Sequence, residues 1–157
     1  MARPPRTVVR DLGFRALNAL HGAVLRSTRG RWGASAFGMP VVELQTTGRR
    51  SGHPHRTLLT VPVVDGDTLI LVASKGGDTR HPDWYRNLVH DGSVVVTRGG
   101  ERLLMRARVA TAEERRRWWP LVIAAYRPYG SYQRRAQRDV PLVLCQPAAD
   151  DLGPSTD

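Results

Sequence analysis

The sequence is short of the features that hold extracellular domains and membrane spans together. It has a single cysteine, Cys145, among 157 residues, which excludes an intramolecular disulfide and fits a reducing compartment. Because Cys145 ends the apolar segment 140–145, we expect a buried structural thiol. No apolar run approaches the roughly 20 residues that a spanning helix needs, and the basic N-terminus lacks the apolar stretch of a signal peptide. We therefore expect a cytoplasmic protein.

Lysine is almost absent as well. Of the 24 basic side chains, all but Lys75 are arginine. Lys75 stands in Ala73-Ser74-Lys75-Gly76-Gly77, directly after the apolar run 69–72. Lysine is a compact, flexible point charge whereas arginine is a planar fork, and glycines let backbone N–H groups approach an anion closely. The loop therefore suits an anion, and a solvated lysine in a surface turn is an equally good explanation at this point.

Acidic residues are in the minority. The formal net charge is +10, and three of the 14 acidic side chains, Asp150, Asp151 and Asp157, lie in residues 148–157, which we expect to form a loose tail. The rest of the chain is thus distinctly basic. Its expected partners are nucleic acid, an acidic membrane surface, or a polyanionic cofactor or substrate. Nucleic acid is the least favoured, because the basic residues are spread along the chain and no nucleic-acid-binding motif is present.

Local patterns predict one α+β domain. Strands are predicted at residues 41–46, 55–64, 68–73, 93–98, 101–109 and 140–145, and helices at 82–90 and 112–126. Pro62 either interrupts the second strand or makes it an edge strand of the sheet. Residues 28–40 contain the glycines that are typical of a loop. Because tight turns link most strands, most pairs should be antiparallel. The expected fold is a small closed or half-open barrel of about six strands with interspersed helices.

The first 30 residues form a unit of their own in this interpretation, ahead of the barrel domain at 31–147. Apolar residues recur at helical spacing over 7–27, and arginines flank that stripe. Such a basic amphipathic helix either caps the core of the domain or lies on an anionic bilayer surface. The second alternative would place the protein peripherally on the inner face of the cell membrane.

Two loops suit an anion. In the segment 46–56, two arginines and a serine stand between Gly48 and Gly52 at a strand end, and arginine forks bind phosphate or carboxylate at two points. The alternative is an exposed basic turn. The second loop is the one with Lys75. If the strands at 55–64 and 68–73 pair as a hairpin through Asp65-Gly66-Asp67, both loops lie at the same end of the sheet.

Two further segments carry aromatic residues. Arg80–Leu88 opens a short helix, whose N-terminal N–H groups favour an anion; Trp84 and Tyr85 in it either wall a planar ring or pack in the core. The other segment repeats tyrosine at Tyr126, Tyr129 and Tyr132. Tyrosines supply flat apolar surface and a hydroxyl, so these either cover a ring system and donate a proton near a reacting atom, or pack a helix end on the barrel.

Histidine gives little evidence for a metal site. His53 and His55 form the pair H-x-H, but no cysteine, carboxylate or third histidine completes a ligand set nearby. We expect no bound metal.

In their order and spacing, these segments resemble the deazaflavin (coenzyme F420)-dependent nitroreductase family of split β-barrel oxidoreductases, known mainly from mycobacteria and other actinomycetes. The resemblance covers roughly residues 41–147. The matching motifs are Thr47-Gly48-Arg49-Arg50-Ser51-Gly52-x-Pro54, Ala73-Ser74-Lys75-Gly76-Gly77, Pro82-x-Trp84-Tyr85-x-Asn87-Leu88, Thr111-x-Glu113-Glu114-Arg115, Trp119-Pro120, Tyr126-x-x-Tyr129-x-x-Tyr132-Gln133 and Val140-Pro141-Leu142-Val143-Leu144. What it implies is a split β-barrel that binds coenzyme F420, a flavin-like deazaflavin with a phospholactyl tail and several glutamates.

The resemblance also implies roles for individual residues. The cofactor would be lined on one side by Arg50, Ser51, Gly52, Arg56, Thr57, Leu58, Leu59, Thr60 and Val61. Its phosphate and ring edge would be held by Ser74 and Lys75, and Val72 and Ala73 would also contact the cofactor. The tail and ring would be cradled by Asp83, Trp84, Tyr85, Arg86 and Asn87. Tyr129 would contact the cofactor, and Tyr126 and Tyr132 would border the acceptor pocket.

The implied activity is hydride transfer from the reduced deazaflavin to a quinone-like or nitro-aromatic acceptor, with the protein supplying position and electrostatics. A tyrosine of the three or Ser74 would give a proton or stabilise an oxyanion. Leu58, Thr60 and His55 depart from many relatives, which have proline, an aromatic residue and arginine at those positions. The alternative is therefore a non-catalytic protein that binds F420 or another anionic ligand.

Overall fold

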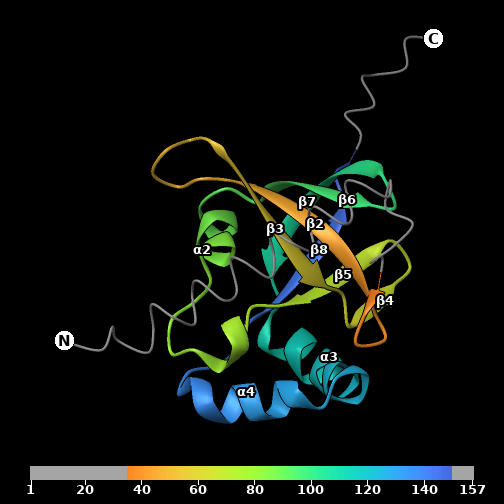
Figure 1. Cartoon of the computed structure of the whole chain (residues 1–157), viewed down its shortest axis with the longest axis vertical. Coiled ribbons are helices and arrows are strands. Elements are labelled where there is room, and N and C mark those ends of the chain that lie inside the picture. Colours follow the sequence, from red (N-terminus) through yellow and green to blue (C-terminus); the bar gives the residue numbers. More distant parts are fainter. Residues whose placement is uncertain (1–34, 150–157) are drawn as a thin grey trace, which may run out of the picture.

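The computed structural model describes residues 35–149. The predicted helix over 7–27 and the acidic residues of the tail lie outside this range. Within it, eight strands form one curled antiparallel sheet (Figure 1). The strands are β1 Ser35–Ala36, β2 Met39–Thr47, β3 Pro54–Thr60, β4 Val63–Asp65, β5 Thr68–Val72, β6 Ser93–Arg98, β7 Glu101–Val109 and β8 Leu142–Pro147. The helices are α2 Asp83–His90, α3 Ala112–Ala125 and α4 Pro128–Ala136, with a single turn, η1, at Lys75–Gly77.

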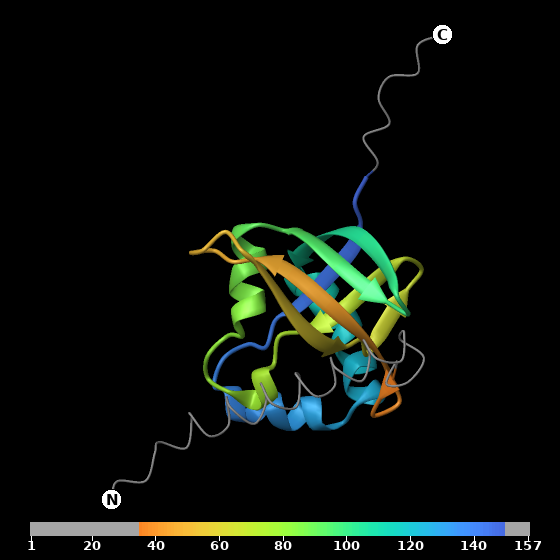
Figure 2. The ribbon, with the colours of Figure 1, turned by 45° about the horizontal axis from the view of Figure 1, so that its top comes forward.

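The sheet is a half-barrel whose two edges are consecutive in the chain. Its order is β3-β2-β6-β7-β8-β5-β4, with the short β1 beside the start of β2. The chain leaves β3 through Val61, whose N–H donates to the Pro40 carbonyl at 2.8 Å. Pro62 follows, and since proline has no N–H, the ladder ends there. Beyond it, β4 pairs with β5 instead, and the sheet curls as the crossing strands of Figure 2 show.

The curled sheet buries side chains on both of its faces. Leu71 of β5 and Val143 of β8 face one cluster, which Trp84 of α2 joins. Their neighbours Ile70 and Leu144 face a second cluster, together with side chains of α3 and α4. Strands covered on both faces have continuous apolar sequences, which explains the uninterrupted apolar runs of β5 and β8. Figure 1 shows α3 and α4 together below the sheet and α2 at its side.

The predicted α+β half-barrel is confirmed, with differences in detail. The strand expected over 55–64 is divided in two, and β1 falls where a loop was expected, so that eight strands replace about six. A capping box begins α3: Thr111 Oγ1 accepts from the Glu114 N–H at 3.2 Å, and the Glu114 carboxylate accepts from the Thr111 N–H at 2.8 Å. The tyrosine segment, expected to follow the helix at 112–126 with no helix of its own, forms a separate helix, α4.

Cys145 lies on β8, fully buried, as the sequence predicts. Burial raises the pKa of its thiol to about 12, so it stays protonated and unreactive. No helix within residues 35–149 combines the length and the apolar character that crossing a membrane requires.

Candidate functional site

The turn between β2 and β3, residues 48–53, is held by one of its own arginines; we name it the arginine turn. The backbone N–H and Nη1 of Arg49 donate to Asn87 Oδ1 at 3.2 and 2.9 Å, and Nη2 donates to Asp83 Oδ1 at 3.2 Å. Asn87 is buried and donates in turn to the buried Thr46 hydroxyl at 3.2 Å. Arg49 is therefore committed to fixing the turn on α2, while Arg50 is exposed.

The second predicted anion site, residues 74–77, has an unusual backbone; we name it the Lys75 loop. Ser74 is right-handed helical, with φ −80° and ψ −32°, and Lys75, Gly76 and Gly77 follow with φ of 47°, 61° and 81°. A right-handed residue followed by a left-handed one turns successive N–H groups to one side, which forms an anion-binding nest. A left-handed lysine costs about 1–2 kcal/mol. Such strain is typical of functional loops.

Ser74 contributes a hydroxyl to this loop. Its side chain is only 7% exposed and does not cap the turn that follows. Gly77 presses the loop against α4, since a Cβ added there would lie 3.0 Å from Tyr132 Cα. The Lys75 loop is thus packed directly on the helix that carries two of the three tyrosines.

Arg138, just beyond α4, holds the segment 73–81 by five hydrogen bonds. Its guanidinium donates to the carbonyls of Ala73, Ser74, Asp78 and Arg80 at 3.1–3.3 Å and contacts His81 Nδ1 at 3.1 Å. Arg135 adds one bond, to the Gly76 carbonyl at 3.2 Å. Because an arginine can only donate, these contacts bind carbonyl oxygens and none of the N–H groups of the loop. We name Arg138 and its five acceptors the arginine clamp.

The clamp also sets the protonation state of His81. An arginine can only donate, so His81 Nδ1 accepts and the ring is neutral in this arrangement. Burial lowers the pKa of His81, and the charges of Arg138 and Arg86 lower it further. The ring also packs on Tyr85, with 4.7 Å between ring centroids.

Tyr126, Tyr129 and Tyr132 form one group, named here the tyrosine cluster. Their ring centroids lie 5.2–6.4 Å apart. Tyr129 is buried, and its hydroxyl lies 3.0 Å from that of Thr60 on β3. A hydrogen bond with Tyr132 and burial raise the pKa of Tyr126 to about 12. Burial raises the pKa of Tyr129 as well, against the opposing effect of Thr60. Tyr126 and Tyr129 are therefore neutral near pH 7.

The predicted site residues differ in burial. Trp84 and Asn87 are buried in the core and behind the arginine turn, whereas Asp83 and Arg86 of the same helix are exposed. On β3, the half-buried residues are Thr57, Leu58, Leu59 and Thr60, and Val61, which directly follows the strand, is buried. Arg56 is exposed and donates to Gln45 at 3.3 Å. Exposed positions include Ser51 and Gly52, while Val72 and Ala73 are buried.

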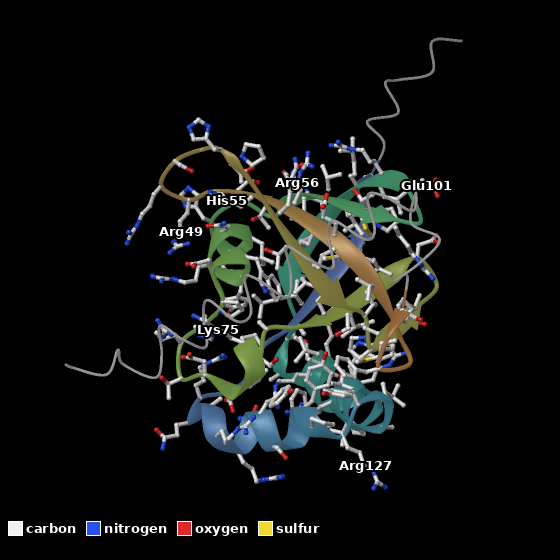
Figure 3. All side chains as sticks on the ribbon, in the orientation of Figure 1. Arg49, His55, Arg56, Lys75, Glu101 and Arg127 are labelled. Carbon is white, nitrogen blue, oxygen red and sulfur yellow. The ribbon has the colours of Figure 1, made fainter. Side chains whose placement is uncertain are left out.

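The hairpin expected between residues 55–64 and 68–73 forms only in part: β3 pairs with β2, and of this segment the short β4 alone pairs with β5. The loops are nevertheless joined through α2. Arg49 binds its side chains, and the clamp binds the segment that leads into it. Figure 3 shows Arg49, His55 and Lys75 on the side of the molecule where α2 lies, with Arg127 and Glu101 away from it in this view.

Sequence reasoning missed the clamp, the Thr60–Tyr129 contact and the structural use of Arg49. Nothing in the sequence distinguishes Arg138 from the other arginines. Its acceptors are mostly backbone carbonyls, which every residue has, so no sequence pattern predicts the contacts. Across residues 35–149, no group of three His, Cys, Asp or Glu side chains could hold a metal ion.

The known proteins that this chain resembles in sequence share one description. Residues 18–147 match the model of the F420H(2)-dependent quinone reductase family. An F420H(2)-dependent quinone reductase of Mycobacterium tuberculosis is 38% identical over 144 residues, covering 88% of this chain and 95% of that protein. A quinone reductase of Mycobacterium bovis matches to the same extent, 38% over 144 residues.

Solved structures agree. One described as an F420-H2 dependent reductase is 38% identical with a TM-score of 0.62, over 68% of this chain and 94% of that one. A second, described as a domain-swapped dimer, is 33% identical with a TM-score of 0.64, over 91% of this chain and all of the other.

Proposed function

The chain belongs to the F420H(2)-dependent quinone reductase family, and we propose that it carries out this reaction between the arginine turn, the Lys75 loop and the tyrosine cluster. Family membership bears out the resemblance found in the sequence and assigns F420 as the cofactor and quinone reduction as the activity. The observation that carries the placement is the contact of an anion-suited nest with α4, through Gly77 and Tyr132.

The residues present fit an elongated polyanion with a planar head. The nest at Ser74 and Lys75 suits a phosphate. The exposed side chains of Arg50 and Arg86 supply cations for carboxylates of a tail. The N-terminus of α2 has no side-chain cap, so its N–H groups and dipole favour the same charge. The tyrosine cluster offers the flat surface that a ring needs.

When bound, the reduced deazaflavin supplies the hydride, and the chain supplies position and polarity. Tyr126 and Tyr132 are half-buried and hydrogen-bonded to one another. Their mutual hydrogen bond engages one of the two phenolic protons, so the other hydroxyl can donate a hydrogen bond to an acceptor oxygen that gains negative charge. Tyr129, whose hydroxyl is hydrogen-bonded to that of Thr60, packs against the rings of Tyr126 and Tyr132. The buried Ser74 hydroxyl is placed to hydrogen-bond to the cofactor.

Quinones are the acceptors that the family name supports. Reduction of nitro-aromatic compounds and contact of the N-terminal segment with an anionic membrane stay predictions, the latter resting on residues outside 35–149. The non-catalytic alternative differs in one measurable respect: such a protein would bind F420 without oxidising its reduced form in the presence of a quinone.

The decisive experiment is a titration of the protein with oxidised F420, followed by the fluorescence of the cofactor. We expect binding at micromolar protein, and Lys75→Ala should weaken it about 30-fold, or about 2 kcal/mol, as expected for a charge-assisted bond. Arg116→Ala removes an exposed cation from α3 and should leave the affinity unchanged. Absence of binding by the unaltered protein would overturn the proposal, and equal losses in both variants would overturn the role of Lys75.

A further inference from the structure

Phe37 occupies a backbone position that does not suit it. It is the first residue of the two-residue turn between β1 and β2, where Ala36 pairs with Met39. The φ angles of Phe37 and Gly38 are 54° and 77°. Hairpin turns with two positive φ angles favour asparagine or aspartate followed by glycine. A bulky residue at such an angle is an outlier, so the turn itself gives no reason for a phenylalanine.

Burial gives no reason either. The side chain of Phe37 is 73% exposed, so it adds little to the hydrophobic stabilisation of the core. Its one ring contact among the described residues is with Tyr126, at 5.2 Å between centroids and a tilt of 41°. The ring is therefore displayed at the surface, directly beside the tyrosine cluster.

We propose that Phe37 is a specificity-determining residue for the electron acceptor. Its ring extends the tyrosine cluster outward by one apolar aromatic surface, on which the ring or apolar substituent of a quinone stacks while Tyr126 faces its oxygen. Offset stacking between aromatic rings is favourable beyond the area that it buries. The hairpin that carries Phe37 is anchored to the sheet by β2, so the ring is presented from a fixed base. This inference rests on the proposed function, because it takes the tyrosine cluster as the acceptor side.

The test replaces the ring without weakening the turn. Phe37→Asn introduces the residue that this turn prefers, so the melting temperature should stay equal or rise. F420 affinity should be unchanged. The KM for an apolar naphthoquinone should rise on the order of tenfold with little change in kcat, the result of removing binding that ground and transition states share. The KM for an unsubstituted benzoquinone should change much less, and Phe37→Trp should restore the naphthoquinone KM.

Leu104→Asn is the matched control. Leu104 on β7 is also 73% exposed, so its loss removes a comparable exposed apolar side chain and should leave every KM unchanged. An unchanged naphthoquinone KM in Phe37→Asn, in an otherwise active protein, would overturn this inference alone. A fall in melting temperature would also overturn it, since the ring would then serve the fold. Failure of the unaltered protein to bind F420 would overturn the proposed function and this inference with it.

Discussion

The arginine turn is bound to α2, the Lys75 loop lies on the segment that leads into that helix, and the two are held in opposite ways. In the turn, Arg49 reaches outward to the side chains of α2. In the loop, Arg138 and Arg135 reach inward from the end of α4 and bind backbone carbonyls. One of the two arginines of the arginine turn, Arg49, therefore fixes the conformation of the turn itself. The conformation of the Lys75 loop is fixed instead by Arg135 and Arg138, which lie about 60 residues further along the chain.

The two regions show that arginine has two different roles in this chain. Arginine in this chain serves as a structural donor at Arg49 and Arg138 and as an exposed cation at Arg50 and Arg86. A structural arginine should show its loss in stability, and an exposed one in affinity for an anionic cofactor. Substitutions in the two regions can therefore break or sharpen the comparison.

The largest effect is expected at Arg138. Arg138→Gln removes a donor with five acceptors, and glutamine is too short to reach more than a few of them. Because hydrogen bonds from charged groups are worth about 1.5–3 kcal/mol, we expect the free energy of unfolding to fall by about 3 kcal/mol. F420 affinity should fall as well, because the Lys75 loop loses its support. Denaturant unfolding and fluorescence titration measure the two.

Arg135→Gln is the control, since Arg135 is exposed and makes one bond to the Gly76 carbonyl. It should cost less than about 1 kcal/mol. Equal stabilities for the two variants would show that the clamp is not what holds the loop.

A smaller effect is expected in the arginine turn, where two adjacent residues form a natural pair. Arg49→Gln should cost about 1–2 kcal/mol of stability, because Oδ1 of the buried Asn87 loses its charged donor. Arg50→Gln, at an exposed position, should leave stability within about 0.5 kcal/mol and weaken F420 binding instead. The comparison fails if the two substitutions exchange these effects, or if both act on the same quantity.

Much of the fold was predictable from local patterns. The continuous apolar runs of β5 and β8, the capping box of α3 and the break at Pro62 each have a direct physical cause in the sequence. The helix α4 was missed because Pro128 and Gly130 have the appearance of helix breakers. Pro128 in fact opens the helix, at a position where its missing N–H costs nothing. The buried Tyr129 then holds the segment against the sheet, a tertiary effect that no local pattern contains.

For the candidate site, the sequence predicted which segments contribute but not how their side chains contact one another. The motifs located the arginine turn, the Lys75 loop and the tyrosine cluster, since each has a characteristic spacing. They could not say that Asn87 is buried beneath Arg49, or that Arg138 supports Ser74. Both arrangements depend on segments more than 30 residues apart in the chain. Only the folded chain brings them together.

The smallest expected effect is a pH dependence that belongs to the Lys75 loop and not to the arginine turn. Burial and the charges of Arg138 and Arg86 lower the pKa of His81 below the usual 6.5. Between that lowered pKa and 6.5, an unfolded chain binds a proton that the folded one does not. Stability should therefore fall as the pH drops through 6.5 and level off below the folded-state pKa. A protonated His81 can no longer accept from Arg138.

The measurement is the melting temperature and F420 affinity of the protein between pH 8 and pH 5, compared with His81→Gln. Glutamine can accept a hydrogen bond from Arg138 through its carbonyl but does not titrate, so the variant should lose less stability and less affinity as the pH falls. The contribution of His81 is the difference between the two curves, which cancels the other titrating groups that both proteins share. Parallel curves would mean that His81 is a passive neighbour of the clamp. Arg49→Gln should lower stability equally at both ends of this range, because no titrating histidine is among the partners of Arg49.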